Sequence, residues 1–309
     1  MEKQRKGEIM NSKNIKKHLN AKLKDWTKHI DNEEVKEIVE ENTIITGGAM
    51  VSLLTGERPH DYDVYFRTKE ACIKVAKYYV DKWNATHKDK PVSLRVGEDG
   101  SVKCFVQSKG IADEDEKNES IIAYNFESTE QEDEEMGIVS DRDPAEDDGK
   151  DKYRPRFLTS NAITLSDKIQ IVTRFYGEVA DIHKNYDFVH CTCAWSSWDN
   201  EVFLPQKALE CIINKELYYV GSKYPLCSII RTRKYLERGY HINAGQYVKM
   251  AFQLNELNLY NLETLEDQLT GVDSGYFMMM IEALKKKADE TGEAVVDKSY
   301  VFELINRMF

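Results

Sequence analysis

Two aspartates, Asp61 and Asp63, stand two positions apart in a run that continues with Val64 and two aromatic residues. β-Branched and aromatic residues in succession predict a β-strand. On a strand, side chains two positions apart point to the same face, which would bring both carboxylates together. Such carboxylates repel each other unless a cation lies between them, and Mg²⁺ prefers hard oxygen ligands. We therefore predict that Asp61 and Asp63 bind Mg²⁺ or Mn²⁺; the alternative is a strand face with two solvated acids.

A glycine pair, Gly47-Gly48, precedes Asp61, and twelve residues separate Gly48 from this aspartate. The pair follows a short apolar run and opens a stretch with the composition of a helix. Glycines let backbone N–H groups approach a phosphate closely, and a helix N-terminus favours negative charge. We therefore predict that the backbone of Gly47, Gly48 and Ala49 binds the phosphates of an NTP. Ser52 either adds a hydroxyl to this site or is an ordinary small residue of the helix.

A glycine pair, a helix and then Asp-x-Asp on the next strand resembles the signature of the nucleotidyltransferase superfamily, which includes poly(A) polymerases and CCA-adding enzymes. Residues 186–191, which read YDFVHC, resemble the Arg-Asp-Phe-Thr-x-Asn stretch of the bacterial-type CCA-adding and poly(A) enzymes. Residues 228–242 resemble a later helix of the same enzymes. The region 160–280 is also similar to nucleotidyltransferase-like proteins encoded by tailed bacteriophages. The order of the three motifs along the chain adds to the likeness.

The resemblance implies metal-dependent transfer of a nucleoside monophosphate from an NTP to an acceptor hydroxyl, with Asp61 and Asp63 as catalytic metal ligands. In this superfamily a third acid from a later strand commonly completes the site. Asp187 is the candidate for this catalytic and metal-binding role, because it opens an expected strand, Asp187–Trp195. Asp167 and Glu178 are the alternative acids.

The second motif departs from the family pattern at Tyr186, where the family has arginine, and at His190-Cys191, where the family has a polar pair ending in asparagine. His190 is either a general base or, as the alternative, a hydrogen-bonded strand histidine.

The expected helix at 226–238 carries several basic residues, and Lys223 stands nearby. The resemblance implies that this helix contacts the incoming nucleotide, because arginine forms bidentate hydrogen bonds and stacks on bases. The predicted nucleotide-binding residues are Arg231, Arg233 and Lys234, with Arg238 on the same face. A solvated helix face is the alternative. Five tyrosines of this region either stack on bases or pack in a core: Tyr218, Tyr219, Tyr224, Tyr235 and Tyr240.

The 309-residue chain carries a net charge of −11, but the acids are unevenly distributed. Residues 111–151 contain seventeen acidic and three basic residues, so the rest of the chain is near neutral. This acidic insert is either a solvated loop or a mimic of nucleic acid in a basic groove. The sequence contains no run of 18 apolar residues, so we expect no membrane span. The basic N-terminus lacks the apolar region of a secretory signal. Six cysteines without a Cys-x-x-Cys pair indicate free thiols in a reducing cytoplasm, that of the host if a phage encodes the chain.

The hydrophobic pattern predicts an α/β (α+β) fold: a nucleotidyltransferase-type mixed or antiparallel sheet with flanking helices, followed by a small all-helical domain. The expected domains are a disordered N-terminus at 1–14, a catalytic domain at 15–203 that contains the acidic insert at 111–151, and a helical domain at 204–309. The expected helices of the first domain include Ile15–Ile30, with an apolar stripe, and Glu33–Glu40, with Asp31 or Asn32 as N-cap. Expected strands are Val92–Val96, Val102–Gln107, Ile121–Phe126, Arg156–Thr159, Ala162–Leu165, Ile169–Phe175 and Phe188–Trp195.

The predicted function is metal-dependent transfer of a nucleoside monophosphate from an NTP. The acceptor favoured by the later motifs is the 3′ end of an RNA, including tRNA. A transferase that modifies a protein or a small molecule is one alternative. A non-catalytic binding or structural protein of a virus, built on the same scaffold, is the other.

Overall fold

The computed structural model describes residues 11–88, 91–97, 100–106, 152–159, 161–269, 280, 283–288 and 297–308. The N-terminal residues 1–10, the acidic insert at 111–151 and the expected strand Ile121–Phe126 lie outside the described residues. The first helix, α1 (Ser12–Thr27), begins within the N-terminal segment expected to be disordered, because the side chain of Asn11 accepts a hydrogen bond from the Asn14 N–H and caps it.

Contacts divide the chain into two compact units. The first comprises residues 1–184 and 191–205, and the second comprises residues 185–190 and 206–309. The short segment Asn185–His190, which the sequence analysis assigns to the first domain, therefore makes its contacts in the second unit. The two units are described separately.

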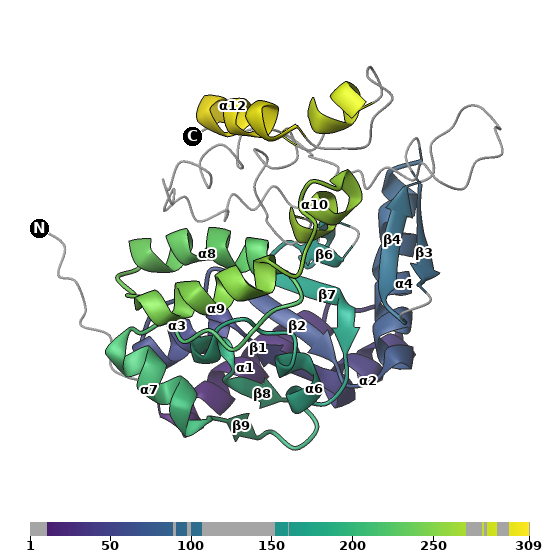
Figure 1. The fold of residues 1–309 in the computed structure, drawn as a ribbon. Coiled ribbons are helices and arrows are strands. Elements are labelled where there is room, and N and C mark those ends of the chain that lie inside the picture. Colours follow the sequence, from purple (N-terminus) through teal and green to yellow (C-terminus); the bar gives the residue numbers. More distant parts are fainter. Residues whose placement is uncertain are drawn as a thin grey trace, which may run out of the picture. The chain divides into compact units, whose positions relative to one another are not determined.

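A seven-stranded mixed sheet in the order β5-β6-β7-β2-β1-β8-β9 forms the centre of the first unit (Figure 1). Only β2 and β7 pair in parallel; the other neighbours are antiparallel. The mixed sheet confirms the predicted fold class. Its strands are β1 (Thr43–Thr46), β2 (Tyr62–Phe66), β5 (Pro155–Leu158), β6 (Ala162–Leu165), β7 (Ile169–Tyr176), β8 (Ala194–Ser196) and β9 (Val202–Phe203). A separate hairpin pairs β3 (Val92–Val96) with β4 (Val102–Val106), as the glycine-containing turn predicts.

One face of the sheet is apolar. Ile45, Val64, Ile171 and Ile163 lie on it and are at most 1% exposed. The helices α2 (Glu33–Asn42) and α4 (Lys69–Thr86) lie next to β1 and to β2 and β7, respectively. The predicted stripe of α1 is buried throughout, and Asn32 caps α2 as predicted. The helices α3 (Gly48–Thr55) and α6 (Val179–His183) complete this unit.

The expected strand Phe188–Trp195 is wrong in most of its length. Phe188 forms a single β-bridge with Tyr219, residues Val189–Cys191 form a 3₁₀ turn, and only the end of the stretch is strand, as β8. The Val189 N–H donates to the Tyr218 carbonyl instead of to a neighbouring strand of the sheet. A short apolar run does not reveal which segment its backbone will pair with, so tertiary contacts decide its structure here.

The second unit is helical in its described part. Its helices are α7 (Gln206–Asn214), α8 (Pro225–Glu237), α9 (Ala244–Leu254), α10 (Leu262–Leu269) and α12 (Lys298–Met308). One core consists of Phe188, Leu217, Tyr219, Tyr240 and Met250. A second core consists of Leu265, Leu269, Met280, Leu284 and Leu304. Two of the five tyrosines considered for base stacking, Tyr219 and Tyr240, therefore pack in a core.

All six cysteines are buried and free, as predicted. Cys191 and Cys193 do not lie on one strand, because the strand expected there does not form. No helix in the described part of the chain combines the length and the apolar character needed to cross a bilayer.

Candidate active site

The turn between β1 and α3 is built on Gly47. Its backbone has φ 73° and ψ −141°, a conformation that residues with a Cβ rarely adopt. The Gly47 carbonyl accepts a hydrogen bond from the Val51 N–H, which starts α3, and Gly47 has no side chain to cap that helix. The first N–H groups of a helix have no partner within it and carry positive partial charge. The turn therefore presents donors suited to an anion.

The approach to this backbone is open on the side of Gly48. A Cβ built on Gly48 would meet no described atom within 4 Å. Gly47 and Ala49, on either side, are buried, so Gly48 is the residue of this turn that a ligand can approach directly. Ser52 lies one turn further along α3 and is half-buried. The predicted phosphate-binding residues thus share one short segment with space in front of it.

The pairing of β1 with β2 brings the two aspartates to this turn. Thr46, the last residue of β1, lies opposite Asp63. Asp61 immediately precedes β2 and is exposed, whereas Asp63 is half-buried. The two strands are antiparallel. The glycine turn that ends β1 and the aspartates at the start of β2 therefore lie at the same end of this strand pair.

Asp63 belongs to a polar row that crosses four adjacent strands. Asp63 pairs with Thr46 of β1 and with Gln170 of β7, and Gln170 pairs with Thr164 of β6. Side chains of directly paired residues point to the same side of a sheet. The row therefore lies on the face opposite to Ile45 and Val64, and Gln170 and Thr164 are half-buried there. Thr46 is fully buried, so the half-buried members of the row are the ones that a polar ligand could contact.

His183 is a functional candidate that the sequence analysis missed. Its Nε2 lies 2.8 Å from Thr46 Oγ1, and the same hydroxyl lies 2.8 Å from the Cys193 carbonyl. Because the hydroxyl has one hydrogen to donate and the carbonyl only accepts, the His183 ring is the donor to Thr46. Burial lowers the pKa of His183 to about 4, so the ring is neutral at pH 7. The sequence does not indicate this contact, because a single histidine at the end of a short helix forms no recognisable motif.

The other predicted catalytic acid, Asp187, lies in the second unit. Its side chain is 8% exposed and accepts a hydrogen bond from Arg231 at 3.0 Å. Two predicted site residues are thus paired with each other, and the guanidinium neutralises the carboxylate. Of the remaining basic residues predicted to bind nucleotide, Arg233 pairs with Glu237 and Lys234 is exposed on α8.

The alternative candidates have other environments. Asp167 lies in the turn between β6 and β7, and Glu178 forms an ion pair with Arg67. His190 is 1% exposed and packs against the rings of Tyr235 and Tyr240. Burial lowers the pKa of His190 to about 4. Among the residues that the structure describes, no group of three or more His, Cys, Asp and Glu side chains is arranged to hold a metal ion.

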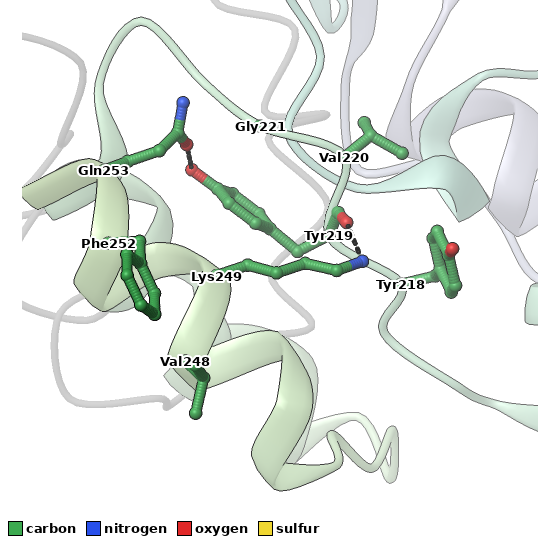
Figure 2. A pocket seen from close by; sticks show the side chains of 8 residues that line it. All are labelled: Tyr218, Tyr219, Val220, Gly221, Val248, Lys249, Phe252 and Gln253. Atoms are coloured by element: carbon green, nitrogen blue, oxygen red, sulfur yellow. Dashed lines mark hydrogen bonds between the residues drawn. The ribbon is translucent and has the colours of Figure 1, made fainter.

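The second unit also contains a groove of about 550 Å³ beside α9 (Figure 2). The Lys249 ammonium lies 4.3 Å from the Tyr218 ring and donates to the Tyr219 carbonyl and to Gln246. Phe252, on the same helix, is 72% exposed. The other lining residues are Tyr219, Val220, Gly221, Val248 and Gln253.

Comparison with known proteins identifies one family. Residues 17–215, more than half of the chain, match the model of a family described as Gabija anti-defense 2 family protein. A relative named Gabija anti-defense 2, from Bacillus phage SPbetaL7, is 22% identical over 151 residues. That match covers 46% of this chain and 38% of the relative, so it spans well under half of the relative's length.

Two solved structures of CCA-adding enzymes also align. The Thermotoga maritima enzyme in complex with a tRNA is 11% identical, and a CCA-adding enzyme in complex with CTP is 12% identical. Each alignment covers 86% of this chain and 54% of the other, with a TM-score of 0.37. A TM-score of this size does not indicate a common fold.

The buried His183 predicts an acid sensitivity of the first unit. Because burial lowers its folded pKa from 6.5 to about 4, the neutral ring contributes stability that is present above pH 6.5 and is lost as the pH falls towards 4. Between pH 7 and pH 5, the wild-type protein should lose up to about 2 kcal/mol more unfolding free energy than His183→Gln. Urea denaturation at both pH values measures this difference. Glutamine can still donate to Thr46, so an equal loss in both proteins would contradict the assignment.

Proposed function

We propose that this chain, which belongs to the Gabija anti-defense 2 family, is a metal-dependent nucleotidyltransferase that acts against a bacterial defence. The reaction transfers a nucleoside monophosphate from an NTP to an acceptor hydroxyl and releases pyrophosphate. The observation that supports this reaction is the register of β1 and β2. It brings Gly47-Gly48 and the pair Asp61 and Asp63 to the same end of the two strands. The anti-defence role rests on the family description and on the name of the phage relative.

The two aspartates fit a divalent metal ion in their chemistry. Both are hard oxygen donors; Asp61 immediately precedes β2 and is exposed, and Asp63 lies on β2 and is half-buried. Bound there, Mg²⁺ or Mn²⁺ would neutralise charge on the phosphate oxygens and lower the pKa of the attacking hydroxyl. Asp187, the acid predicted as a third ligand, belongs to the other unit and pairs there with Arg231.

The backbone of the turn would bind the phosphates that leave as pyrophosphate. The N–H groups of Gly48 and Ala49 belong to the first turn of α3, and the open space at Gly48 allows a phosphate oxygen to approach. The Ser52 hydroxyl, one turn on, is the candidate for an additional donor. These groups would hold the NTP so that its α-phosphate faces the two aspartates.

The acceptor that we propose is the 3′ end of an RNA. The groove beside α9 supports this choice, because the exposed ring of Phe252 can stack on a base while Lys249, which also lines the groove, attracts phosphate. The ammonium groups of Lys249 and Lys207 lie 4.3 Å and 5.1 Å from the Tyr218 ring. The anti-defence description favours a second candidate, in which the acceptor is a protein or a small molecule of the defence system.

A transfer assay tests the reaction and the acceptor. Each α-labelled NTP is incubated with the protein, Mg²⁺ or Mn²⁺, and either total RNA or total protein from bacterial cells. We expect label on RNA, and a decrease to the level without enzyme in the double variant Asp61→Asn, Asp63→Asn. Asparagine keeps the shape of the side chain and removes its charge, so loss of transfer with retained folding implicates the carboxylates.

The other outcomes are equally specific. Label on protein would retain the chemistry and overturn the RNA acceptor. No transfer from any NTP would overturn the enzymatic proposal. Cells that carry the Gabija defence provide a second readout, in which the same double variant should no longer protect an infecting phage.

Gly48→Ala should separate ligand binding from folding. The added methyl group meets no described atom within 4 Å, and alanine favours a helix start, so the stability should be unchanged or raised by about 0.4–1 kcal/mol. The methyl group would project into the space that a phosphate needs, and we expect NTP affinity to fall about tenfold or more. Isothermal titration calorimetry with a non-hydrolysable NTP measures the affinity.

Gly47→Ala is the comparison for this prediction. At φ 73° a Cβ strains the backbone by about 1–3 kcal/mol, so this variant should lose stability as well as affinity. Unchanged NTP affinity in Gly48→Ala would exclude the turn as the phosphate site.

Phe252→Ala should weaken RNA binding without affecting the reaction centre. The ring is 72% exposed, so its removal costs little stability, whereas loss of one stacked base reduces affinity by about 1–3 kcal/mol. Fluorescence anisotropy with a labelled single-stranded RNA measures the change. Phe302→Ala, which removes a 55% exposed ring from α12, is the matched control. Equal affinities for all three proteins would remove the groove from the acceptor site.

A further inference from the structure

Three non-glycine residues with left-handed backbone lie together behind the aspartate pair. Their φ values are 55° for Tyr153, 60° for Asp167 and 66° for Lys168. Asp167 and Lys168 are the last two residues of the three-residue turn 166–168 between β6 and β7, and the Tyr153 N–H donates to the Asp167 carboxylate at 3.3 Å. Outside glycine, positive φ is adopted mainly by asparagine and aspartate, so a lysine here is strained. Such a conformation persists only where neighbouring contacts hold it.

Lys22 of α1 supplies those contacts. Its ammonium donates to the Asp167 carbonyl at 2.6 Å and to the Tyr153 hydroxyl at 3.1 Å. The Tyr153 hydroxyl in turn donates to the Asp25 carboxylate at 2.7 Å, and the ammonium lies 4.8 Å from the Tyr153 ring. One half-buried side chain thus links the helix to two of the three left-handed residues.

The turn is joined directly to the aspartate pair through Tyr62. The Lys168 carbonyl accepts a hydrogen bond from the Tyr62 N–H at 2.8 Å. Nε2 of His18, also on α1, lies 2.7 Å from the Tyr62 hydroxyl, and the Tyr62 ring is 5.3 Å from the Lys22 ammonium. Tyr62 stands between Asp61 and Asp63 and points to the other face of the sheet, where it is 5% exposed. The backbone and the side chain of Tyr62 are therefore both tied to α1, the backbone through the turn.

We propose that Lys22 is a positioning residue for the metal site: by holding the Asp167–Lys168 turn it fixes Tyr62 and hence the spacing and direction of the Asp61 and Asp63 carboxylates. This inference rests on the proposed function, because it assigns Lys22 to the same site. It is distinct from a ligand role, since Lys22 lies on the opposite face of the sheet from the carboxylates.

The environment of Lys22 shows why a charged side chain is needed there. Burial lowers its pKa to about 8, while Asp167 and Asp25 raise it and Lys152 and Lys168 lower it. An apolar side chain of the same length would fill the space without the cost of desolvating an ammonium. What only the ammonium supplies is several hydrogen bonds at once, to a backbone carbonyl and to a hydroxyl on separate segments.

Binding of Mn²⁺ tests the proposal without requiring turnover. Titration of the full-length protein, followed by the electron paramagnetic resonance signal of free Mn²⁺, gives the dissociation constant. We expect Lys22→Met to weaken binding roughly tenfold, the lower end of the range for residues that orient metal ligands. Tyr153→Phe removes one hydrogen-bond acceptor of Lys22 and should weaken Mn²⁺ binding less. This variant replaces Lys22→Met in the test if Lys22→Met does not fold.

Two controls separate positioning from general stability. Lys16→Met removes a lysine from the same helix, one that pairs with Glu201 near the surface, and should bind Mn²⁺ as the wild type does. Asn32→Ala removes the N-cap of α2 and should lower the melting temperature with unchanged Mn²⁺ affinity. If Lys22→Met folds and binds Mn²⁺ like the wild type, Lys22 does not position the site. If the wild type itself binds no Mn²⁺, the proposed function fails instead.

Discussion

The antiparallel register of β1 and β2 is the constraint on which the candidate site depends. Thr46 opposite Asp63 places the glycine turn beside the aspartates and directs the Asp63 carboxylate to the face opposite to Ile45 and Val64. A slip by one residue would turn the aspartates into the apolar core and expose Val64. Burying two unpaired carboxylates costs far more than one strand pairing contributes. The apolar residues of these strands therefore determine where the acids lie, although they take no part in binding.

The parts of the fold that are specified locally could be predicted from the sequence. A short apolar run, a glycine pair and a run of β-branched and aromatic residues define β1, α3 and β2, and the stripe of α1 is visible in its periodicity. His183 and Lys22 could not be predicted in their roles, because each acts through a residue more than 100 positions away in the chain. The strand expected at Phe188–Trp195 failed for the same reason, since Phe188 pairs with Tyr219 of the helical unit.

Asp187 and Arg231 pair with each other. The motifs predict separate roles for them, Asp187 as a metal ligand and Arg231 as a nucleotide-binding residue. A carboxylate that is 8% exposed needs a partner, and removal of either residue would leave a poorly solvated charge. The Asp187 carbonyl also accepts the Val220 N–H, which fixes the segment at both backbone and side chain. The ion pair therefore has a structural use in the second unit: it secures the short segment Asn185–His190. Any contact of Arg231 with a nucleotide would have to keep this pair or replace its charge.

Residues with positive φ flank the aspartate pair on both sides. Gly47 has a positive φ on one side of the aspartate pair, and Asp167 and Lys168 have positive φ on the other, one strand away at the start of β7. Glycine adopts its conformation without a steric cost, whereas Asp167 and Lys168 need Lys22 to hold theirs. Strain that is maintained by long-range contacts and that adjoins two carboxylates is difficult to explain by folding alone, because a glycine in the turn would remove it. The contacts that hold this turn also hold Tyr62, which stands between Asp61 and Asp63, so they fix the position of the start of β2.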